Sequence, residues 1–90
     1  MPSKSKDTSG RFSQSPEAVF GRILKGLRTA QSLSQDELAF RSGYSRRFLD
    51  YVEQGQKSPS LRTLFNLCSA LDVSPGDVIR DVEQQVKRNR

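Results

Sequence analysis

Five serines, each followed by a short segment with apolar residues at helical spacing, restrict how this chain can fold. They are Ser15, Ser34, Ser45, Ser60 and Ser74. A serine hydroxyl accepts a hydrogen bond from an unpaired N–H group in the first turn of a helix, so each serine marks a helix start. No segment alternates apolar and polar residues as a strand would. The pattern predicts an all-α domain of five short helices packed around one core.

The first three helices have clear limits in the sequence. Ser15-Pro16-Glu17 starts the first helix, which runs to about Ala30. Its buried face is expected to contain Phe20, Ile23, Leu24 and Leu27. Ser34-Gln35-Asp36-Glu37 is a capping box that starts the second helix. Gly43 and Gly55, which tolerate the left-handed backbone conformation, end the second and the third helix.

The last two helices carry the broadest apolar faces. We expect the fourth helix to bury all the apolar residues on its face. These residues are Leu61, Leu64, Phe65, Leu67, Cys68 and Leu71. In the fifth helix, which begins at Ser74-Pro75, we expect Val78 and Ile79 to complete the core.

The composition excludes several classes of function. The chain has no histidine and one cysteine, so it offers neither a metal site nor the usual general base. We therefore expect that the protein is not an enzyme and binds no cofactor. No apolar segment reaches the roughly 20 residues that cross a bilayer, and no signal peptide is evident, which predicts a cytoplasmic protein. The net charge of +5 favours an anionic partner.

Ninety residues allow one small domain with two flanking segments. Residues 1–14 are rich in serine and lysine, and we expect them to form a flexible arm. The charges of this arm, Lys4, Lys6 and Arg11, either reach the anionic partner or are simply solvated. Residues 15–81 form the expected folded domain, and residues 82–90 extend the last helix into a basic tail.

Two short helices joined by a tight turn with a glycine indicate a helix-turn-helix. From about Val19 to Ile79 the chain resembles the phage-repressor (Cro/Xre-type) helix-turn-helix family. The resemblance rests on Ser34-Gln35-x-x-Leu38-Ala39, Gly43-x-Ser45, Val52-Glu53-x-Gly55 and Pro59-Ser60-Leu61-x-x-Leu64. It implies a five-helix, lambda-repressor-like DNA-binding domain with the helix-turn-helix at the second and third helices.

The helix between Ser45 and Gly55 has an apolar side and a polar side. A rotation of 100° per residue places Phe48, Leu49 and Val52 opposite a polar face. The family resemblance implies that this face reads bases through Arg46, Arg47, Asp50 and Tyr51. An arginine can donate two hydrogen bonds to guanine. A solvated face is the alternative for both arginines, and for Tyr51 the alternative is a ring lying over the stem of Arg47.

A second group of residues is expected to contact phosphates, which position the domain without encoding sequence. The resemblance implies this role for Gln35, and the predicted set is Gln35, Ser45, Gln54, Lys57, Ser58 and Ser60. For Ser60 a helix cap alone is an equally good interpretation. For Lys57 the alternative is a solvated charge.

Two further pairs are predicted to organise the protein. The resemblance implies a partly buried salt bridge between Arg28 and Glu53 that orients the recognition helix. Val82 and Val86, four residues apart, continue an apolar stripe toward the chain end, and we expect them to form a dimer interface. Packing of the same two valines on the first helix of their own chain is the alternative.

These features together predict a sequence-specific regulator of transcription that binds double-stranded DNA, of the repressor or controller type. We expect a homodimer on palindromic operators, with the third helix in the major groove and half-sites about 34 Å apart. No small-molecule ligand is expected, because no ligand-binding domain follows the helix-turn-helix. The alternative is an antitoxin-like or adaptor module whose main partner is a protein.

Overall fold

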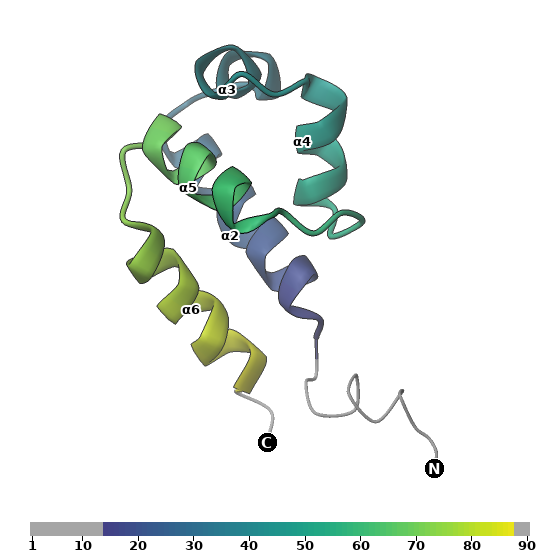
Figure 1. The fold of residues 1–90 in the computed structure, drawn as a ribbon, viewed down its shortest axis with the longest axis vertical. Coiled ribbons are helices and arrows are strands. Elements are labelled where there is room, and N and C mark those ends of the chain that lie inside the picture. The colour runs from purple at the N-terminus through teal and green to yellow at the C-terminus, as the bar shows by residue number, and fades with distance from the viewer. Residues whose placement is uncertain (1–13, 88–90) are drawn as a thin grey trace.

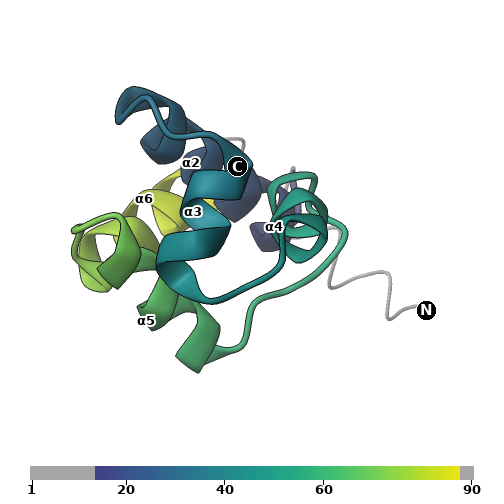
Figure 2. The same cartoon turned by 90° about the horizontal axis from the view of Figure 1, so that it is seen from above.

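A computed structural model describes residues 14–87, which form five α-helices and no strand. The helices are α2 (Pro16–Ala30), α3 (Gln35–Ser42), α4 (Arg46–Glu53), α5 (Leu61–Ala70) and α6 (Pro75–Lys87). Helices α4 and α6 lie on opposite sides of the molecule, and α2 contacts both (Figures 1 and 2). The all-α prediction with five helices is confirmed. The expected arm and its basic residues lie outside the described residues, apart from Gln14.

Each of the five predicted serine caps is present. The hydroxyls of Ser15, Ser34, Ser45 and Ser60 each accept a hydrogen bond at 3.0 Å from the N–H group three residues later. Ser74 accepts the equivalent bond at 3.3 Å. Because the bonds span only three residues, each helix start is set by local sequence.

The turns after α2 and α5 each contain a non-glycine residue in a left-handed conformation, which the sequence did not predict. Ser32 and Asp72 adopt left-handed conformations, with φ of 61° and 58°. In each turn the next residue donates its N–H back into the helix, from Leu33 to the carbonyl of Arg28 and from Val73 to that of Cys68. These bonds satisfy carbonyl groups at the helix end. At many helix ends the residue in the left-handed conformation is a glycine.

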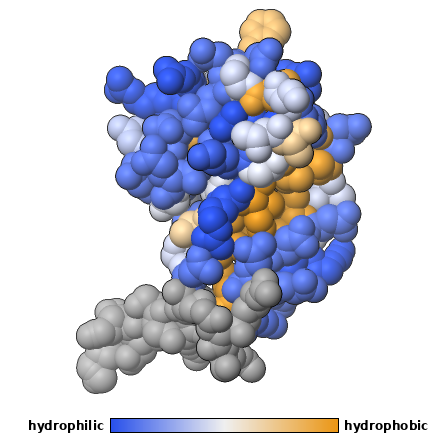
Figure 3. All heavy atoms as spheres, turned by 180° about the vertical axis from the view of Figure 1, so that it is seen from behind, coloured by the Kyte–Doolittle hydropathy of each residue, from blue (hydrophilic) through white to orange (hydrophobic). Residues whose placement is uncertain are grey.

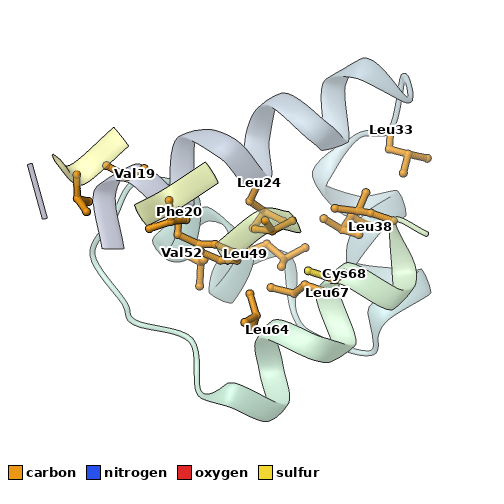
Figure 4. Packing of buried hydrophobic residues seen from close by; sticks show 14 residues of the cluster. Val19, Phe20, Leu24, Leu33, Leu38, Leu49, Val52, Leu64, Leu67 and Cys68 are labelled. Carbon is orange, nitrogen blue, oxygen red and sulfur yellow. The ribbon is translucent and has the colours of Figure 1, made fainter. Parts of the chain in front are cut away.

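The core joins residues from all five helices (Figure 4). Leu38 of α3 and both Leu49 and Val52 of α4 are fully buried. They pack with Leu24 of α2 and Leu67 of α5 in the same cluster. The helix-turn-helix is therefore built into the core of the domain through the inner sides of both its helices.

The expected burial of three apolar residues is wrong. Leu61 and Phe65 of α5 are 72% and 54% exposed, and Ile79 of α6 is 48% exposed. The helices are short, and the part of the chain that the structure describes supplies no element to cover this side of α5. The face shown in Figure 3 is mainly hydrophilic, with an apolar band across part of it.

Val82 and Val86 require a correction of the expected dimer interface. Their side chains are only 8% and 6% exposed, and they belong to the core cluster with Val78. Helix α6 packs along α2, so these valines contribute to the core of their own subunit. Packing within the same chain was the alternative that the sequence left open. The predicted boundary between residues 81 and 82 falls inside α6 and does not separate two structural units.

Helices α2 and α4 meet backbone to backbone. A Cβ atom placed on Gly21 of α2 would lie 2.5 Å from the carbonyl oxygens of Val52 and Glu53. A Cβ on Gly55, where φ is 77°, would lie 2.9 Å from Cα of Ala18. These contacts fix the end of α4 against the first half of α2.

A methyl group at this contact should destabilise the domain. We expect Gly21→Ala to lower the free energy of unfolding by about 1–3 kcal/mol, because the helices would have to separate to admit it. Urea denaturation measures the change.

Gly26→Ala is the matched control on the same helix, since no atom lies within 4 Å of the added Cβ. It should raise the free energy of unfolding by about 0.5–1 kcal/mol through higher helix propensity. Equal effects of the two substitutions would show that the close contact does not matter.

Candidate nucleic-acid interface

A tight turn places α4 at a fixed position after α3. Gly43 ends α3 with φ of 82°, in the left-handed region that the sequence predicted. Ser45 then caps α4 through the N–H of Phe48. Leu49 and Val52 face the core, so the opposite side of α4 faces outward. This is the arrangement of a helix-turn-helix.

The first turn of α4 presents two exposed arginines, Arg46 and Arg47. The positive end of a helix dipole disfavours cations, and no acidic residue lies in this turn. Arg46 Nε lies 3.8 Å from Asp36 Oδ1, but both side chains are largely exposed, so this pair contributes little stability. The arrangement favours the binding of an anion at the N-terminus of α4.

Asp50 lies on the same face and is held by two side-chain amides. Hydrogen bonds from Gln35 and Gln54 hold the pKa of the Asp50 carboxyl below its ordinary value, and the charges of Arg46 and Lys25 add to this effect. The carboxylate is therefore the form present at neutral pH. Its two oxygens accept from the two amides at 3.2 and 2.8 Å.

The predicted pair of Arg28 and Glu53 is present and buried. Arg28 Nε donates to Glu53 Oε2 at 2.7 Å and Nη2 donates to Oε1 at 3.0 Å. Arg28 Nη1 also donates to the carbonyl of Leu33 at 2.8 Å, just before α3. The hydrogen bond to Glu53 raises the pKa of the Arg28 guanidinium, and the charge of Glu53 adds to it. One arginine thus connects α2, α4 and the start of α3.

The residues predicted to contact phosphates do not form one uniform set. Ser45 and Ser60 use their hydroxyls as helix caps. Gln54 is exposed and donates to Asp50. Lys57 is exposed, with Nζ 5.6 Å from the centre of the Tyr51 ring. The structure thus places the Lys57 ammonium over the Tyr51 ring.

The other two residues predicted to contact phosphates lie on different elements, α3 and the loop before α5. Gln35 is half-buried, and its amide donates to carboxylates of α4. Ser58 is exposed in the loop before α5, where it lines a hollow with Pro59 and Leu61.

The sequence analysis did not identify two residues that contribute to this region, Lys25 and Tyr44. Lys25 lies on α2, three residues before Arg28 and therefore on the same side of the helix, and its charge acts on Asp50. The Tyr44 hydroxyl donates to Thr63 Oγ1 at 3.1 Å and accepts from Asn66 at 2.9 Å. These bonds tie the turn of the helix-turn-helix to α5. The helical spacing from Arg28 is a signal that points to Lys25, whereas nothing in the sequence points to the bonds of Tyr44.

Within residues 14–87, no helix is long and apolar enough to cross a membrane. The same residues contain no group of three or more side chains placed to hold a metal ion.

The two short helices, their glycine turn and the exposed basic first turn define a helix-turn-helix DNA-binding domain. Residues 24–78 match the helix-turn-helix family HTH_3, and the chain belongs to this family. The family is one of DNA-binding regulators of transcription and not of enzymes.

Three relatives illustrate the similarity. The HTH-type transcriptional regulator y4dJ of Sinorhizobium fredii is 34% identical over 73% of this chain and 86% of its own. The control protein C.BamHI of Bacillus amyloliquefaciens is 31% identical over 68% of this chain and 76% of its own. The crystal structure of the restriction-modification controller C.AhdI from Aeromonas hydrophila is 44% identical, with a TM-score of 0.66. That match covers 68% of this chain and 92% of the controller.

Removing one partner of the buried ion pair should destabilise the domain strongly. We expect Arg28→Met to lower the free energy of unfolding by about 3–5 kcal/mol, because Glu53 would remain buried without its counter-charge. The double variant Arg28→Met/Glu53→Leu should recover most of that loss, since it leaves no buried charge. Urea denaturation of both proteins gives the comparison.

Lys87→Met removes one side of an exposed pair with Glu83 and serves as the control. It should change the free energy of unfolding by less than about 1 kcal/mol. A double variant as unstable as Arg28→Met would contradict the expectation for the buried pair.

Proposed function

We propose that this protein is a repressor or controller of transcription that binds a palindromic operator as a homodimer, with α4 in the major groove. The observation that carries the proposal is the placement of Arg46 and Arg47. Both are exposed at the first turn of a helix whose opposite side is fixed in the core. In this docking geometry the N-terminal residues of the second helix come closest to the base edges.

The charges on α4 match this geometry. A guanidinium can donate two hydrogen bonds to O6 and N7 of guanine, which gives base selectivity. The N–H groups at the start of α4 and its dipole attract phosphate as well. At the other end of α4, Tyr51 and Lys57 are exposed, and Lys57 supplies a cation for the DNA backbone.

The surface of Leu61, Phe65 and Ile79 is the proposed dimer interface, in place of the two buried valines. Leu61 and Ile79 line one hollow, and Leu61 and Phe65 line the next, so the three exposed side chains are contiguous. A twofold axis places such a patch against its own copy. Burial of these apolar atoms would drive association.

The relatives support a regulator of the controller type. C.BamHI is a control protein, and C.AhdI is a restriction-modification controller. We propose a comparable role here, with regulation by protein concentration and dimerisation and without a small-molecule ligand. Such a protein would act in the cytoplasm, where the DNA is.

The two arginines should be required for sequence selection. In a selection from random duplex DNA, the wild-type protein should enrich a palindrome with half-sites about 34 Å apart. Arg46→Ala/Arg47→Ala should abolish this enrichment, because each lost base contact costs about 1–3 kcal/mol of discrimination.

Arg80→Ala/Lys87→Ala on α6 is the control, since it removes the same charge from the side of the molecule opposite α4. It should lower general affinity for DNA and keep the enriched sequence. Loss of enrichment in both double variants would mean that net charge, rather than base contact, explains binding.

The apolar patch should be required for dimers. We expect Phe65→Glu to weaken dimerisation by about 2 kcal/mol or more, because it places a charge in the apolar interface. Sedimentation equilibrium over a range of protein concentrations measures the change.

Phe40→Glu on α3 is the control, since Phe40 is 91% exposed and lies outside the patch. It should leave the dimer constant unchanged. Equal dimerisation of Phe65→Glu and wild type would place the interface elsewhere.

A further inference from the structure

Tyr44 connects the turn of the helix-turn-helix to α5. Its hydroxyl donates to Thr63 Oγ1 at 3.1 Å and accepts from Asn66 Nδ2 at 2.9 Å. Thr63 and Asn66 are three residues apart and lie on the same side of α5. Thr63 is buried, and its Oγ1 also accepts from Ser60, which caps α5. Two successive turns of α5 therefore hold the same hydroxyl.

The ring of Tyr44 contacts the beginning of α4. The centre of this ring lies 5.3 Å from that of Phe48, in the first turn of α4, and the two ring planes are tilted by 33°. Aromatic pairs at this separation attract each other beyond the effect of their burial. Both rings are half-buried and pack against the core cluster. Tyr44 therefore contacts α4 through its ring and α5 through its hydroxyl.

These contacts hold the end of α4 that carries the two arginines. The contact at Gly21 holds the other end of the helix, at Val52 and Glu53. Helix α4 packs on α2 and α3, whereas α5 packs on α3 and α6. Apolar packing is non-directional, but a hydrogen bond requires a narrow range of distances and angles. The bonds of Tyr44 thus define the place of the beginning of α4 relative to α5 more closely than the core alone would.

The place of α4 relative to α5 matters in a dimer. In the proposed dimer, Leu61 and Phe65 of α5 face the partner, while Arg46 and Arg47 of α4 face the DNA. Asn66 lines the same hollow as Leu61 and Phe65, so the connection through Tyr44 ends beside the proposed interface. A twofold axis applies any displacement of α4 twice. A shift of about 1.7 Å in each subunit would therefore change the separation of the two α4 helices by one base-pair step of about 3.4 Å.

We propose that Tyr44 is a positioning residue that selects the spacing between half-sites. Its hydroxyl, held by Thr63 and Asn66, fixes the beginning of α4 relative to α5 and thereby fixes the separation of the two α4 helices. The inference rests on the proposed function, in which Arg46 and Arg47 read the bases, and on the dimer interface proposed with it.

Tyr44→Phe tests the inference, because it removes the hydroxyl and keeps the ring against Phe48. Affinity is measured for the palindrome that the wild-type protein selects and for duplexes whose half-sites are one base pair closer or farther apart. The ratio of these affinities is the penalty for altered spacing. We expect Tyr44→Phe to reduce this penalty by about three- to tenfold, because an altered spacing no longer strains neutral hydrogen bonds of that strength.

Tyr51→Phe is the matched control. It removes the same hydroxyl from the exposed side of α4, which faces the DNA in the proposed complex. It should change the affinity for all spacings by one factor and leave the penalty unchanged. The same uniform change in Tyr44→Phe would indicate direct DNA contact by the Tyr44 hydroxyl and would overturn the inference. An unchanged affinity for every spacing in Tyr44→Phe would overturn it as well.

Asn66→Ala tests the connection from the side of α5. It removes one of the two bonds of the Tyr44 hydroxyl and should reduce the spacing penalty less than Tyr44→Phe does. Because Tyr44→Phe already removes both bonds, the double variant should match Tyr44→Phe. Additive effects on the penalty would contradict this expectation and the inference. Sedimentation equilibrium should show that Tyr44→Phe dimerises as wild type, since a weakened dimer would place its effect in the interface and not in the position of α4.

Urea unfolding without DNA provides an independent readout of the same cycle. The effects of Tyr44→Phe and Asn66→Ala on the unfolding equilibrium should be less than multiplicative, because both remove the bond between the amide and the hydroxyl. Independent effects would overturn the inference even if an operator is found.

The failure of the inference differs from the failure of the proposed function. If the wild-type protein selects no sequence, the proposed function fails and the spacing role of Tyr44 fails with it, even where coupling in unfolding persists. If the wild-type protein selects a palindrome and Tyr44→Phe keeps the full spacing penalty, the inference alone fails.

Discussion

The buried pair of Arg28 and Glu53 is the interaction on which the rest of the structure depends. Burying either charge alone would be costly, so the pair requires α2 and α4 to stay together. The third bond of Arg28, to the carbonyl of Leu33, adds the start of α3 to the same arrangement. Because desolvation offsets much of the attraction within a buried pair, we expect the pair to contribute orientation rather than a large net stability.

Around this pair, α4 divides into a constrained side and a variable side. Leu49 and Val52 lie in the core, and Gly21 brings α2 against the end of α4. Arg46 and Arg47 project from the other side, where neither has a buried partner among residues 14–87. The scaffold therefore fixes the position of the two side chains that we propose read bases, while their chemistry can vary. This division suits a site grafted on a common fold.

Local signals in the sequence predicted the helices, and tertiary contacts explain what it missed. The serine caps and Gly43 act within three or four residues, so they could be recognised directly. Helical periodicity showed that Phe65 lies on an apolar face, but not whether another helix covers that face. The family resemblance supplied the partner of Arg28. The bonds of Gln35 depend on how α3 meets α4, which no spacing along the chain reveals.

The backbone contact at Gly21 also bears on whether the protein or the DNA would change shape when they bind. With no side chain between α2 and the end of α4, the recognition helix has little freedom to tilt or slide. In the proposed dimer, a mismatch between the spacing of the two α4 helices and the DNA duplex would then be absorbed by the DNA. Flexible steps would bend at lower energetic cost than stiff ones, so base pairs that no side chain touches would contribute to recognition.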